Sequence, residues 1–373
     1  MRQIPFHRSS LNYIDWHQFS KQLQKLKTFQ GSASLQVEVS KICQEFSNGE
    51  HYYFVNSGTA ALELALMALK LESGDEVILP SLTFTSCANS ILRAGAQPVF
   101  CEVALPNLHL CLESIKALVT SNTKAIMVVE YAGIRSDLAK IREFCDQRAI
   151  CLILDAAQSF GAAGPDDHSN LADFVCYSFH DTKVFSCGEG GLLIVNNDRH
   201  LENVETMLEK GTDRRKFFNG SVDKYTWQGI GSSFILSDIN LLLLSMQIKE
   251  RGSILHDKMS SIRVYDEYFH QLKNDHLLSF SKHSKTSNGH IFWLLLKDKE
   301  YLIKLKEALK QNLIESTTHY VPLHSAPFSK VNKFRYSDSM DLTNIAGESL
   351  LRLPVLSENE AIKVVSILKR YMP

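Results

Sequence analysis

Residues 178–191 read SFHDTKVFSCGEGG, and this stretch places a lysine between two apolar segments. The preceding residues, LADFVCYSF (171–179), predict a buried strand, and so do the following residues, GGLLIVNN (190–197). A free ammonium ion buried between two core strands is energetically costly. Lys183 therefore either reaches solvent or has a chemical role that its surroundings support.

Around this stretch, from about residue 50 to residue 195, short apolar segments alternate with helical patterns. The strands we expect are HYYFVN, DEVILP, QPVFCEV, KAIMVVE and CLILDAAQ. Alternating strands and helices predict a mostly parallel sheet with helices on both faces. After about residue 240 the pattern changes to a long helix, a strand and further helices. We predict an α/β fold with a large domain over residues 1–245 and a smaller α+β C-terminal domain over residues 246–373.

The composition is that of an ordinary globular protein, with 45% hydrophobic and 22% charged residues among 373. A formal net charge of -1 gives no electrostatic basis for binding nucleic acid or an anionic membrane. Eight cysteines occur without a CxxC pair, which favours reduced thiols over disulfides or a zinc site. No apolar run approaches the roughly 20 residues that span a bilayer, and the first residues lack the apolar run of a signal peptide. We expect a cytoplasmic protein without a metal.

Polar and aromatic residues follow several expected strands, at the sheet edge where ligands bind in open parallel sheets. Ser57, Gly58 and Thr59 lie between a strand and a helix, so free backbone N–H groups could hold a phosphate there. Taken alone, these residues are more often an ordinary helix N-cap. Phe84 follows the next strand and could lie flat on a cofactor ring, although a core phenylalanine is the commoner role.

Asp155 ends an apolar strand, and Gln158 follows three residues later. A buried carboxylate needs a partner, for which a protonated ring nitrogen would serve as well as a lysine or an arginine. A purely structural aspartate is about as common. Lys183 follows 28 residues after Asp155 and fits a Schiff-base lysine, because an imine removes the burial cost of an ammonium ion. The order of phosphate loop, aromatic residue, aspartate and lysine is far more specific than any one member.

The segments SGTAAL, PSLTFTS, DAAQ and SFHDTKVFSCGEGG resemble those of the pyridoxal-phosphate (PLP) sugar aminotransferases of the DegT/DnrJ/EryC1/StrS family. The resemblance covers nearly the whole chain and implies the type I, or aspartate-aminotransferase, fold. It implies that Lys183 holds the cofactor and moves the proton, while Asp155 pairs with the pyridinium nitrogen. It also implies ring contacts for Phe84 and Gln158, phosphate contacts for Gly58, Thr59, Ala60 and Ser178, a place beside the lysine for His180, and a backbone turn for Gly188, Glu189, Gly190 and Gly191.

Two positions depart from the pattern of many relatives. Glu130 stands where many relatives have a histidine, so no role is assigned to it. Ser233 stands where many have an asparagine that reaches the phosphate in the partner subunit. Phosphate binding across subunits by Ser232 or Ser233 is therefore a hypothesis. The resemblance also implies at least a homodimer with shared active sites.

The segment EKGTDRRKFFNGSVDKYTWQGIGSS (209–233) resembles the bacterial transaminases that make dTDP-4-amino-4,6-dideoxy-D-galactose from dTDP-4-dehydro-6-deoxy-D-glucose. This implies L-glutamate as amino donor and a role in surface polysaccharide synthesis. The region expected to contact the sugar nucleotide contains Arg214, Lys224, Tyr225 and Trp227, since arginine and lysine suit a diphosphate. A solvated loop is the alternative. In HYVPLH, the residues expected near the active site are His319, Tyr320 and His324, and zinc binding there is a poor alternative.

Several other functions stay open. The same chemistry could give the 4-amino-4,6-dideoxy-D-glucose product or act on a 3-keto sugar. A PLP sugar dehydratase carries a histidine in place of the lysine, so Lys183 argues against that reaction. A regulatory PLP-binding relative without turnover would have lost Lys183 or Asp155, and both are present. A plain nucleotide-binding module is less consistent still, because no GxGxxG motif follows the first strand.

Overall fold

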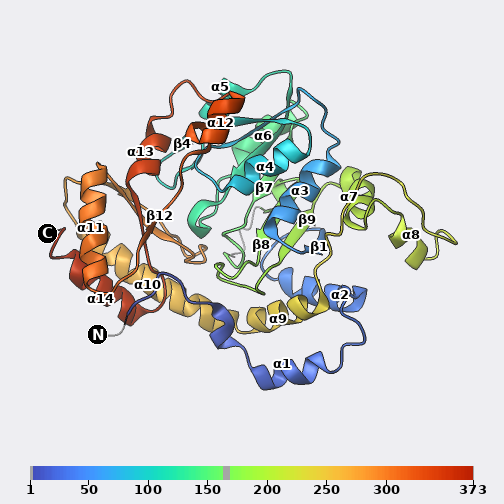
Figure 1. Cartoon of the computed structure of the whole chain (residues 1–373), viewed down its shortest axis with the longest axis horizontal. Helices are drawn as coiled ribbons and strands as arrows, with labels where there is room; N and C mark the ends of the chain where they lie inside the picture. Colours follow the sequence, from blue (N-terminus) through green and yellow to red (C-terminus); the bar gives the residue numbers. More distant parts are fainter. Residues whose placement is uncertain (1–2, 163–168, 373) are drawn as a thin grey trace.

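A computed structural model describes residues 3–162 and 169–372, and Figure 1 shows how their elements are arranged. The large sheet has the strand order β1-β9-β8-β7-β6-β2-β3. Its strands are β1 (His51–Val55), β2 (Glu76–Pro80), β3 (Gln97–Cys101), β6 (Thr123–Val129), β7 (Cys151–Asp155), β8 (Phe174–Ser178) and β9 (Gly191–Val195). The strands from β8 to β3 pair in parallel, whereas β9 is antiparallel to both its neighbours. The predicted mostly parallel sheet is confirmed.

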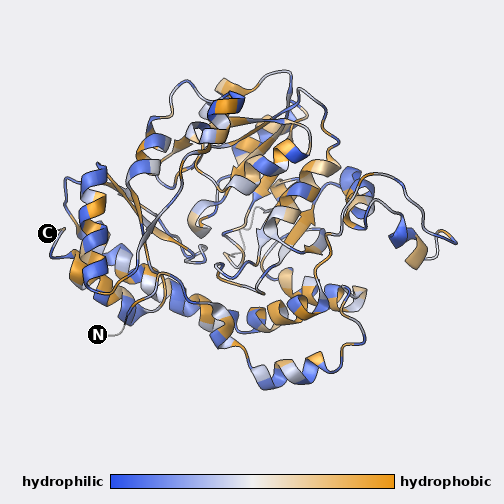
Figure 2. Ribbon diagram, in the orientation of Figure 1, coloured by the Kyte–Doolittle hydropathy of each residue, from blue (hydrophilic) through white to orange (hydrophobic). Residues whose placement is uncertain are grey.

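Apolar cores lie on both faces of the large sheet, as expected for parallel strands buried on two sides. In β7, Leu152 and Leu154 belong to one core, while Cys151 and Ile153 belong to the other. One face is covered by α3 (Gly58–Ala68), α4 (Thr85–Arg93) and α7 (Leu201–Leu208); the other by α2 (Ala33–Cys43), α5 (Leu112–Leu118), α6 (Ala139–Asp146) and α9 (Asp238–Lys249). Figure 2 shows hydrophobic colours along the strands of this sheet.

A second, smaller sheet has four antiparallel strands in the order β10-β11-β13-β12. These are β10 (Leu277–Phe280), β11 (Phe292–Leu296), β12 (Thr317–Thr318) and β13 (Leu350–Leu353). Its core is shared with α10 (Arg251–Gln271), α11 (Lys299–Gln311) and α14 (Glu358–Leu368). Ile4 joins this core and bridges to Ile314, so the N-terminal segment packs beside the small sheet. The predicted division at residue 245 falls inside α9 and stays a prediction.

The remaining helices and strands have at most nine residues each. They are α1 (Trp16–Leu23), β4 (Val103–Ala104), β5 (His109–Leu110), α8 (Arg214–Phe218), α12 (Pro327–Asn332) and α13 (Asp341–Ser349). Figure 1 shows α8 and the loop after it extending away from the two sheets. Among the described residues, no helix is both long and apolar enough to cross a membrane. The carboxyl ends of β7 and β8 face the small sheet across a cavity.

Candidate active site

A cavity of about 550 Å³ lies where the strands of the large sheet end, and the small sheet closes its other side. This is the place that open parallel sheets offer to ligands. The predicted residues that line it are Ser57, Gly58, Thr59, Phe84, Asp155, Gln158, Ser178, His180, Lys183, Glu189, His319 and Tyr320. Residues that are far apart in the sequence are therefore brought together in one site.

Asp155 is the last residue of β7, and only 5% of its surface is exposed. Its Oδ1 accepts the backbone N–H of Ala157 at 3.0 Å, and its Oδ2 accepts the thiol of Cys87 at 3.0 Å. Burial raises the pKa of Asp155, while both hydrogen bonds and the charge of Lys183 act in the opposite direction. A protonated ring nitrogen would supply the positive charge that this buried carboxylate needs.

Lys183 lies in the loop between β8 and β9, where its backbone N–H donates to the carbonyl of His180 at 2.9 Å. Burial lowers the pKa of Lys183 to about 8; the charge of Asp155 raises it and that of Arg352 lowers it further. An amine with such a pKa is neutral far more often near pH 7 than an exposed lysine. It can therefore attack a carbonyl carbon, as a Schiff-base lysine must.

The turn from β1 into α3 forms a cradle for a phosphate. Ser57 caps α3 by accepting the N–H of Ala60 at 3.0 Å, and the hydroxyl of Thr59 lies 2.7 Å from that of Ser86. A Cβ at Gly58 would come within 2.6 Å of the Cβ of Ser178, so glycine lets the end of β8 approach the helix. Hydroxyls and free N–H groups at a helix N-terminus fit a phosphate. Ala60, also predicted to bind it, donates its N–H to Ser57.

Aromatic rings form a wall of the cavity. Phe84 is 57% exposed, and its ring centroid lies 6.3 Å from that of Tyr320. Gln158 is fixed beside them, because its Oε1 accepts the N–H of Ala132 at 2.8 Å and its Nε2 lies 3.5 Å from the Tyr320 hydroxyl. An accessible phenylalanine next to the buried carboxylate fits stacking on a planar ring.

His180 lies at the cavity next to the lysine, as predicted. Its Nδ1 accepts the N–H of Thr182 at 3.2 Å and lies 2.9 Å from the hydroxyl of the same residue. Its Nε2 lies 3.6 Å from the carboxylate of Glu189. These contacts brace the glycine-rich bend that follows Lys183. They indicate that His180 helps to shape the loop.

Four residues predicted to contact the sugar nucleotide lie outside the cavity of this chain. Arg214, at the start of α8, forms an ion pair with Glu209 at 2.9 Å. Lys224, Tyr225 and Trp227 follow in the extended loop, where Trp227 is 81% exposed. None of the four is among the described residues that line the cavity. Their contacts with a substrate stay predictions.

Two further predicted residues also lie away from the cavity lining. The carbonyl of Ser233 accepts the side-chain amide of Asn56 at 3.0 Å, beside the strand end that leads into α3. The Nδ1 of His324 lies 2.7 Å from the hydroxyl of Ser81, and its backbone N–H donates to the same oxygen at 3.1 Å. His324 thus joins the segment after β12 to the end of β2. A role for Ser232 or Ser233 in a partner subunit stays a prediction.

Glu130, which replaces the usual histidine, is buried outside the cavity lining. Its carboxylate forms an ion pair with Arg135 at 3.2 Å and accepts the N–H of Ser136 and the hydroxyl of Ser159. These bonds fix the loop after β6 to the loop after β7, which carries Gln158. Glu130 therefore has a structural role that supports the cavity.

The cavity also contains charged residues that the sequence analysis missed. Arg352 comes from β13 and Lys258 from α10, and both line the cavity. The amine of Lys258 donates to the carbonyl of Val355 at 2.7 Å, and burial lowers its pKa to about 8. An available signal was the sequence LLRL, which places an arginine inside an apolar strand. A buried arginine, like the buried carboxylate of Asp155, needs a partner for its charge, which makes it a candidate site residue.

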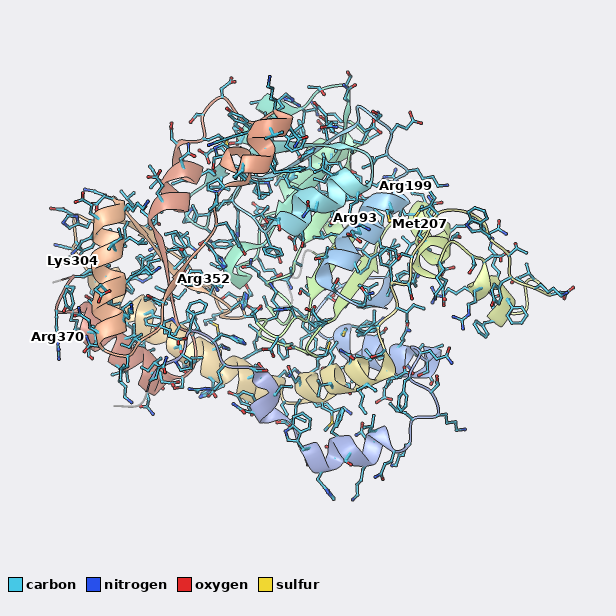
Figure 3. All side chains as sticks on the ribbon, in the orientation of Figure 1. Arg93, Arg199, Met207, Lys304, Arg352 and Arg370 are labelled. Carbon is cyan, nitrogen blue, oxygen red and sulfur yellow. The ribbon has the colours of Figure 1, made fainter. Side chains whose placement is uncertain are left out.

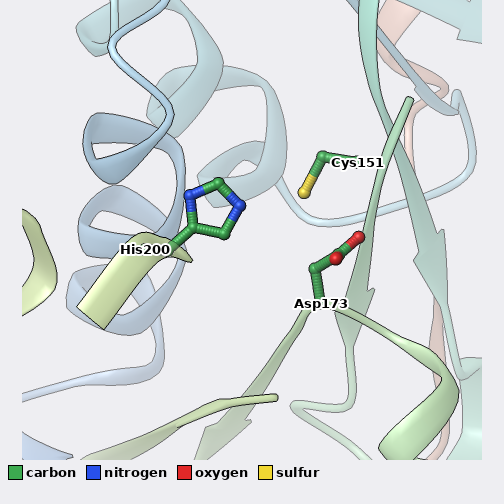
Figure 4. Close-up of side chains that lie close together, drawn as sticks. All are labelled: Cys151, Asp173 and His200. Carbon is green, nitrogen blue, oxygen red and sulfur yellow. The ribbon is translucent and has the colours of Figure 1, made fainter. Parts of the chain in front are cut away.

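A second cluster of titratable side chains, Cys151, Asp173 and His200, lies at the opposite, amino end of β7 and β8 (Figure 4). The carboxylate of Asp173 accepts the N–H of Leu152 at 2.8 Å and forms an ion pair with Arg142 at 2.9 Å. Burial would raise the pKa of Asp173, but these and other hydrogen bonds hold it below its ordinary value. The positive charge of Arg142 beside Asp173 disfavours a metal ion there. The ion pair between the two residues connects the start of β8 to α6.

Comparison with known proteins agrees with this geometry. A family model described as the DegT/DnrJ/EryC1/StrS aminotransferase family matches residues 18–369. A GDP-perosamine synthase from Vibrio cholerae is 27% identical over 339 residues, which are 88% of each chain. A dTDP-4-dehydro-2,3,6-trideoxy-D-glucose 4-aminotransferase from Saccharopolyspora spinosa is 25% identical over 293 residues, or 76% of this chain and 75% of the relative.

Solved structures share the fold along the whole chain. Helicobacter pylori PseC, an aminotransferase involved in the biosynthesis of pseudoaminic acid, has a TM-score of 0.85 at 18% identity and covers 100% of this chain and 99% of its own. The PLP form of Spr1654 from Streptococcus pneumoniae has a TM-score of 0.83 at 23% identity, with 100% and 98% covered. The predicted type I fold is thus confirmed.

The residues of the cavity fit PLP, which is the cofactor of this protein. The helix N-terminus at Gly58 and the hydroxyl of Ser178 suit its phosphate, while Asp155 suits its ring nitrogen and Phe84 suits its ring. Lys183 supplies an amine of lowered pKa in the same cavity. By its fold, its cavity and the match of 18–369, the chain belongs to the DegT/DnrJ/EryC1/StrS aminotransferase family.

Proposed function

We propose that this protein is a nucleotide-sugar aminotransferase. It would move the amino group of L-glutamate to C4 of dTDP-4-dehydro-6-deoxy-D-glucose, giving dTDP-4-amino-4,6-dideoxy-D-galactose and 2-oxoglutarate. The observation that carries the proposal is that Lys183 and Asp155 share one buried cavity with the phosphate cradle at Gly58. In that cavity Lys183 supplies an amine whose pKa is lowered to about 8, as an attacking amine requires.

The names of the relatives support parts of this assignment. The Saccharopolyspora spinosa relative is named for amino transfer at C4 of a dTDP sugar, which supports both C4 and dTDP. The Vibrio cholerae relative is named for a GDP sugar, so dTDP rests mainly on the resemblance of residues 209–233. The galacto configuration rests on that same segment.

The chain's own residues can carry out the proton transfers that the reaction needs. When bound, PLP supplies an electron sink for the charge that develops at the carbon losing its proton. Asp155 keeps the ring nitrogen protonated, because a buried carboxylate stabilises a neighbouring positive charge. Lys183, once free, can take a proton from one carbon and return it to another, since its pKa of about 8 lies near the working pH.

We propose that the extended loop after α8 holds the far end of the sugar nucleotide. Trp227 and Tyr225 are 81% and 50% exposed there, beside Lys224. Large aromatic residues in solvent commonly mark a contact surface. We therefore propose that this loop contacts the substrate bound to a partner subunit, so that the active protein is at least a homodimer.

The test is an absorbance and NMR experiment on purified protein supplied with PLP. The visible band of the lysine-bound cofactor should disappear with L-glutamate and return when dTDP-4-dehydro-6-deoxy-D-glucose is added. NMR of the product should then show an axial amine at C4. If the band returns only with a GDP-linked 4-keto sugar, the substrate is a GDP sugar rather than a dTDP sugar. If the amine is equatorial, the product has the gluco rather than the galacto configuration. A band that resists every amino acid would contradict the aminotransferase assignment.

A further inference from the structure

A second lysine faces the active-site cavity from the side of the small sheet. Lys258 lies in the first half of α10, and it lines the cavity together with Leu353 and Val355. Its amine donates to the carbonyl of Val355 at 2.7 Å, which is its one hydrogen bond within the described part of the chain. Because an ammonium group has three N–H donors, two of them are available to a ligand.

The carboxylates around Lys258 are already engaged with other groups. Asp257 accepts the hydroxyl of Tyr13, and Glu360 forms an ion pair with Arg8 at 2.8 Å. Burial and the charge of Arg8 outweigh these two carboxylates and lower the pKa of Lys258 to about 8, so the amine is still mostly charged at pH 7. A buried cation without an anionic partner is costly, so an anionic group of a ligand would complete this corner of the cavity.

Lys258 lies in the same cavity as Lys183 but not beside it. His290, just before β11, also lines the cavity, and the charges of both lysines lower its pKa. The pKa of Lys183 itself, in contrast, is not shifted by Lys258. A ligand whose carbon reacts at Lys183 would therefore reach Lys258 with a group that lies several bonds away from that carbon.

The chemistry of the two proposed substrates indicates which group this is. L-Glutamate has a second carboxylate, which two methylene groups separate from its reacting carbon. Leu353 and Val355 offer apolar contacts for those methylene groups on this side of the cavity. The sugar ring of the keto sugar carries no charge, and its diphosphate is attached at C1, on the far side of the ring from the reacting C4. A single cation inside the cavity thus fits the amino donor better than the sugar.

We propose that Lys258 binds the side-chain carboxylate of the amino donor and so selects a dicarboxylic amino acid. The two available N–H groups of its ammonium ion can donate to the carboxylate oxygens. An amino acid with an uncharged side chain would leave this cation without an anion, which disfavours its binding. This inference rests on the proposed function and makes Lys258 a specificity residue for the half-reaction with the donor.

The first test measures binding without turnover. 2-Oxoglutarate has both carboxylates of L-glutamate but no amine, and 2-oxopentanoate has a methyl group in place of the side-chain carboxylate. Calorimetric titration of the PLP-loaded wild type should give a dissociation constant about 10- to 100-fold lower for 2-oxoglutarate. Lys258→Met should reduce this ratio to less than about threefold, whereas Lys258→Arg, which keeps a cation, should retain most of it.

Lys304→Met is the matched control, because it removes a lysine from the exposed outer surface of α11 (Figure 3). It should leave both dissociation constants within about twofold of the wild-type values. Equal binding of the two oxo acids by the wild type would overturn the proposal. So would a Lys258→Met variant that binds both more weakly but keeps the wild-type ratio. The wild-type comparison needs no variant, so it decides the question even if Lys258→Met is unstable.

The second test follows the visible cofactor band. In the wild type, L-glutamate should remove the band faster than L-norvaline, which has a methyl group in place of the side-chain carboxylate. Lys258→Met should reduce this ratio of rates at least about tenfold, while the return of the band with the keto sugar changes less than about threefold. An unchanged ratio, or equal slowing of the sugar half-reaction, would overturn the proposal. A wild-type band that resists every amino acid would contradict the proposed function, whereas the titrations with the two oxo acids would still decide on Lys258.

Discussion

Replacing Gly58 by alanine tests the phosphate cradle directly. Helix propensity alone predicts stabilisation by at most about 1 kcal/mol, because alanine is a better helix residue than glycine and Gly58 is the first residue of α3. The structure predicts the opposite sign. The new Cβ would lie 2.6 Å from the Cβ and 3.1 Å from the Oγ of Ser178. Carbon atoms pack at about 3.5–4.0 Å, so these groups must separate by about 1 Å.

This separation costs free energy because the Cβ of Ser178 is fixed to the backbone of β8. A side-chain rotation cannot move that atom away, so the strand itself must shift. Overpacking of this kind costs about 1–3 kcal/mol, which equals or exceeds the gain from propensity. The displaced hydroxyl is also one of the groups that we expect to bind the phosphate. We therefore expect Gly58→Ala to lower the melting temperature of the apoprotein and to raise the dissociation constant of PLP about tenfold or more.

Titration of the apoprotein with PLP and thermal unfolding without PLP measure these two effects separately. Gly252→Ala is a suitable control, since the added Cβ near the start of α10 would have no atom within 4 Å apart from its chain neighbours and the backbone of its own helix. The control should melt at or above the wild-type temperature and bind PLP normally. If Gly58→Ala behaves like Gly252→Ala in both assays, the close approach of β8 to α3 is wrong, and so is the cradle built on it.

Three further predictions concern the groups around the cofactor. Because the pKa of Lys183 is about 8, the rate at which apoprotein captures PLP should reach half its maximum near pH 8, whereas an unshifted lysine would give a midpoint above pH 10. The hydrogen bond from the Cys87 thiol lowers the pKa of Asp155, so Cys87→Ala should raise that pKa. On acidification, the variant should therefore lose PLP affinity at a higher pH than the wild type. Cys87→Ser should restore the wild-type pH dependence of PLP affinity. Glu130→Gln should reduce the free energy of unfolding in urea by about 1–3 kcal/mol, because the buried ion pair between Glu130 and Arg135 is lost. An altered PLP band in that variant would contradict a structural role.

Local sequence patterns were enough to predict the place of a site residue where that place depends on the residue's own strand. Asp155 ends an apolar run, and parallel strands bring their carboxyl ends to one edge, so its neighbourhood with Lys183 follows from the alternation of strands and helices. The same pattern predicted the large sheet and the helix N-terminus at Gly58. These features need no knowledge of how distant segments pack.

Other features depend on contacts that no local pattern encodes. The pairing of β12 with β13 places Thr317 opposite Arg352, and it brings the following residues, His319 and Tyr320, to the cavity. His319 and Tyr320 were expected at the site, but their contact with Arg352 depends on that register. Likewise, the role of Glu130 depends on loops after two different strands. Register and loop packing arise from tertiary contacts, so the sequence left these roles open.

The charges of the cavity bear on how one site can serve two unlike substrates. In the proposed reaction, the amino donor and the nucleotide sugar are both anions, and both present their reacting carbon to Lys183. They differ in how far the negative charge lies from that carbon. Arg352 lies near Lys183, whereas the loop carrying Lys224 lies outside the cavity lining. The two charges therefore lie at different distances from the reacting carbon, so substitutions at the two places should impair different half-reactions.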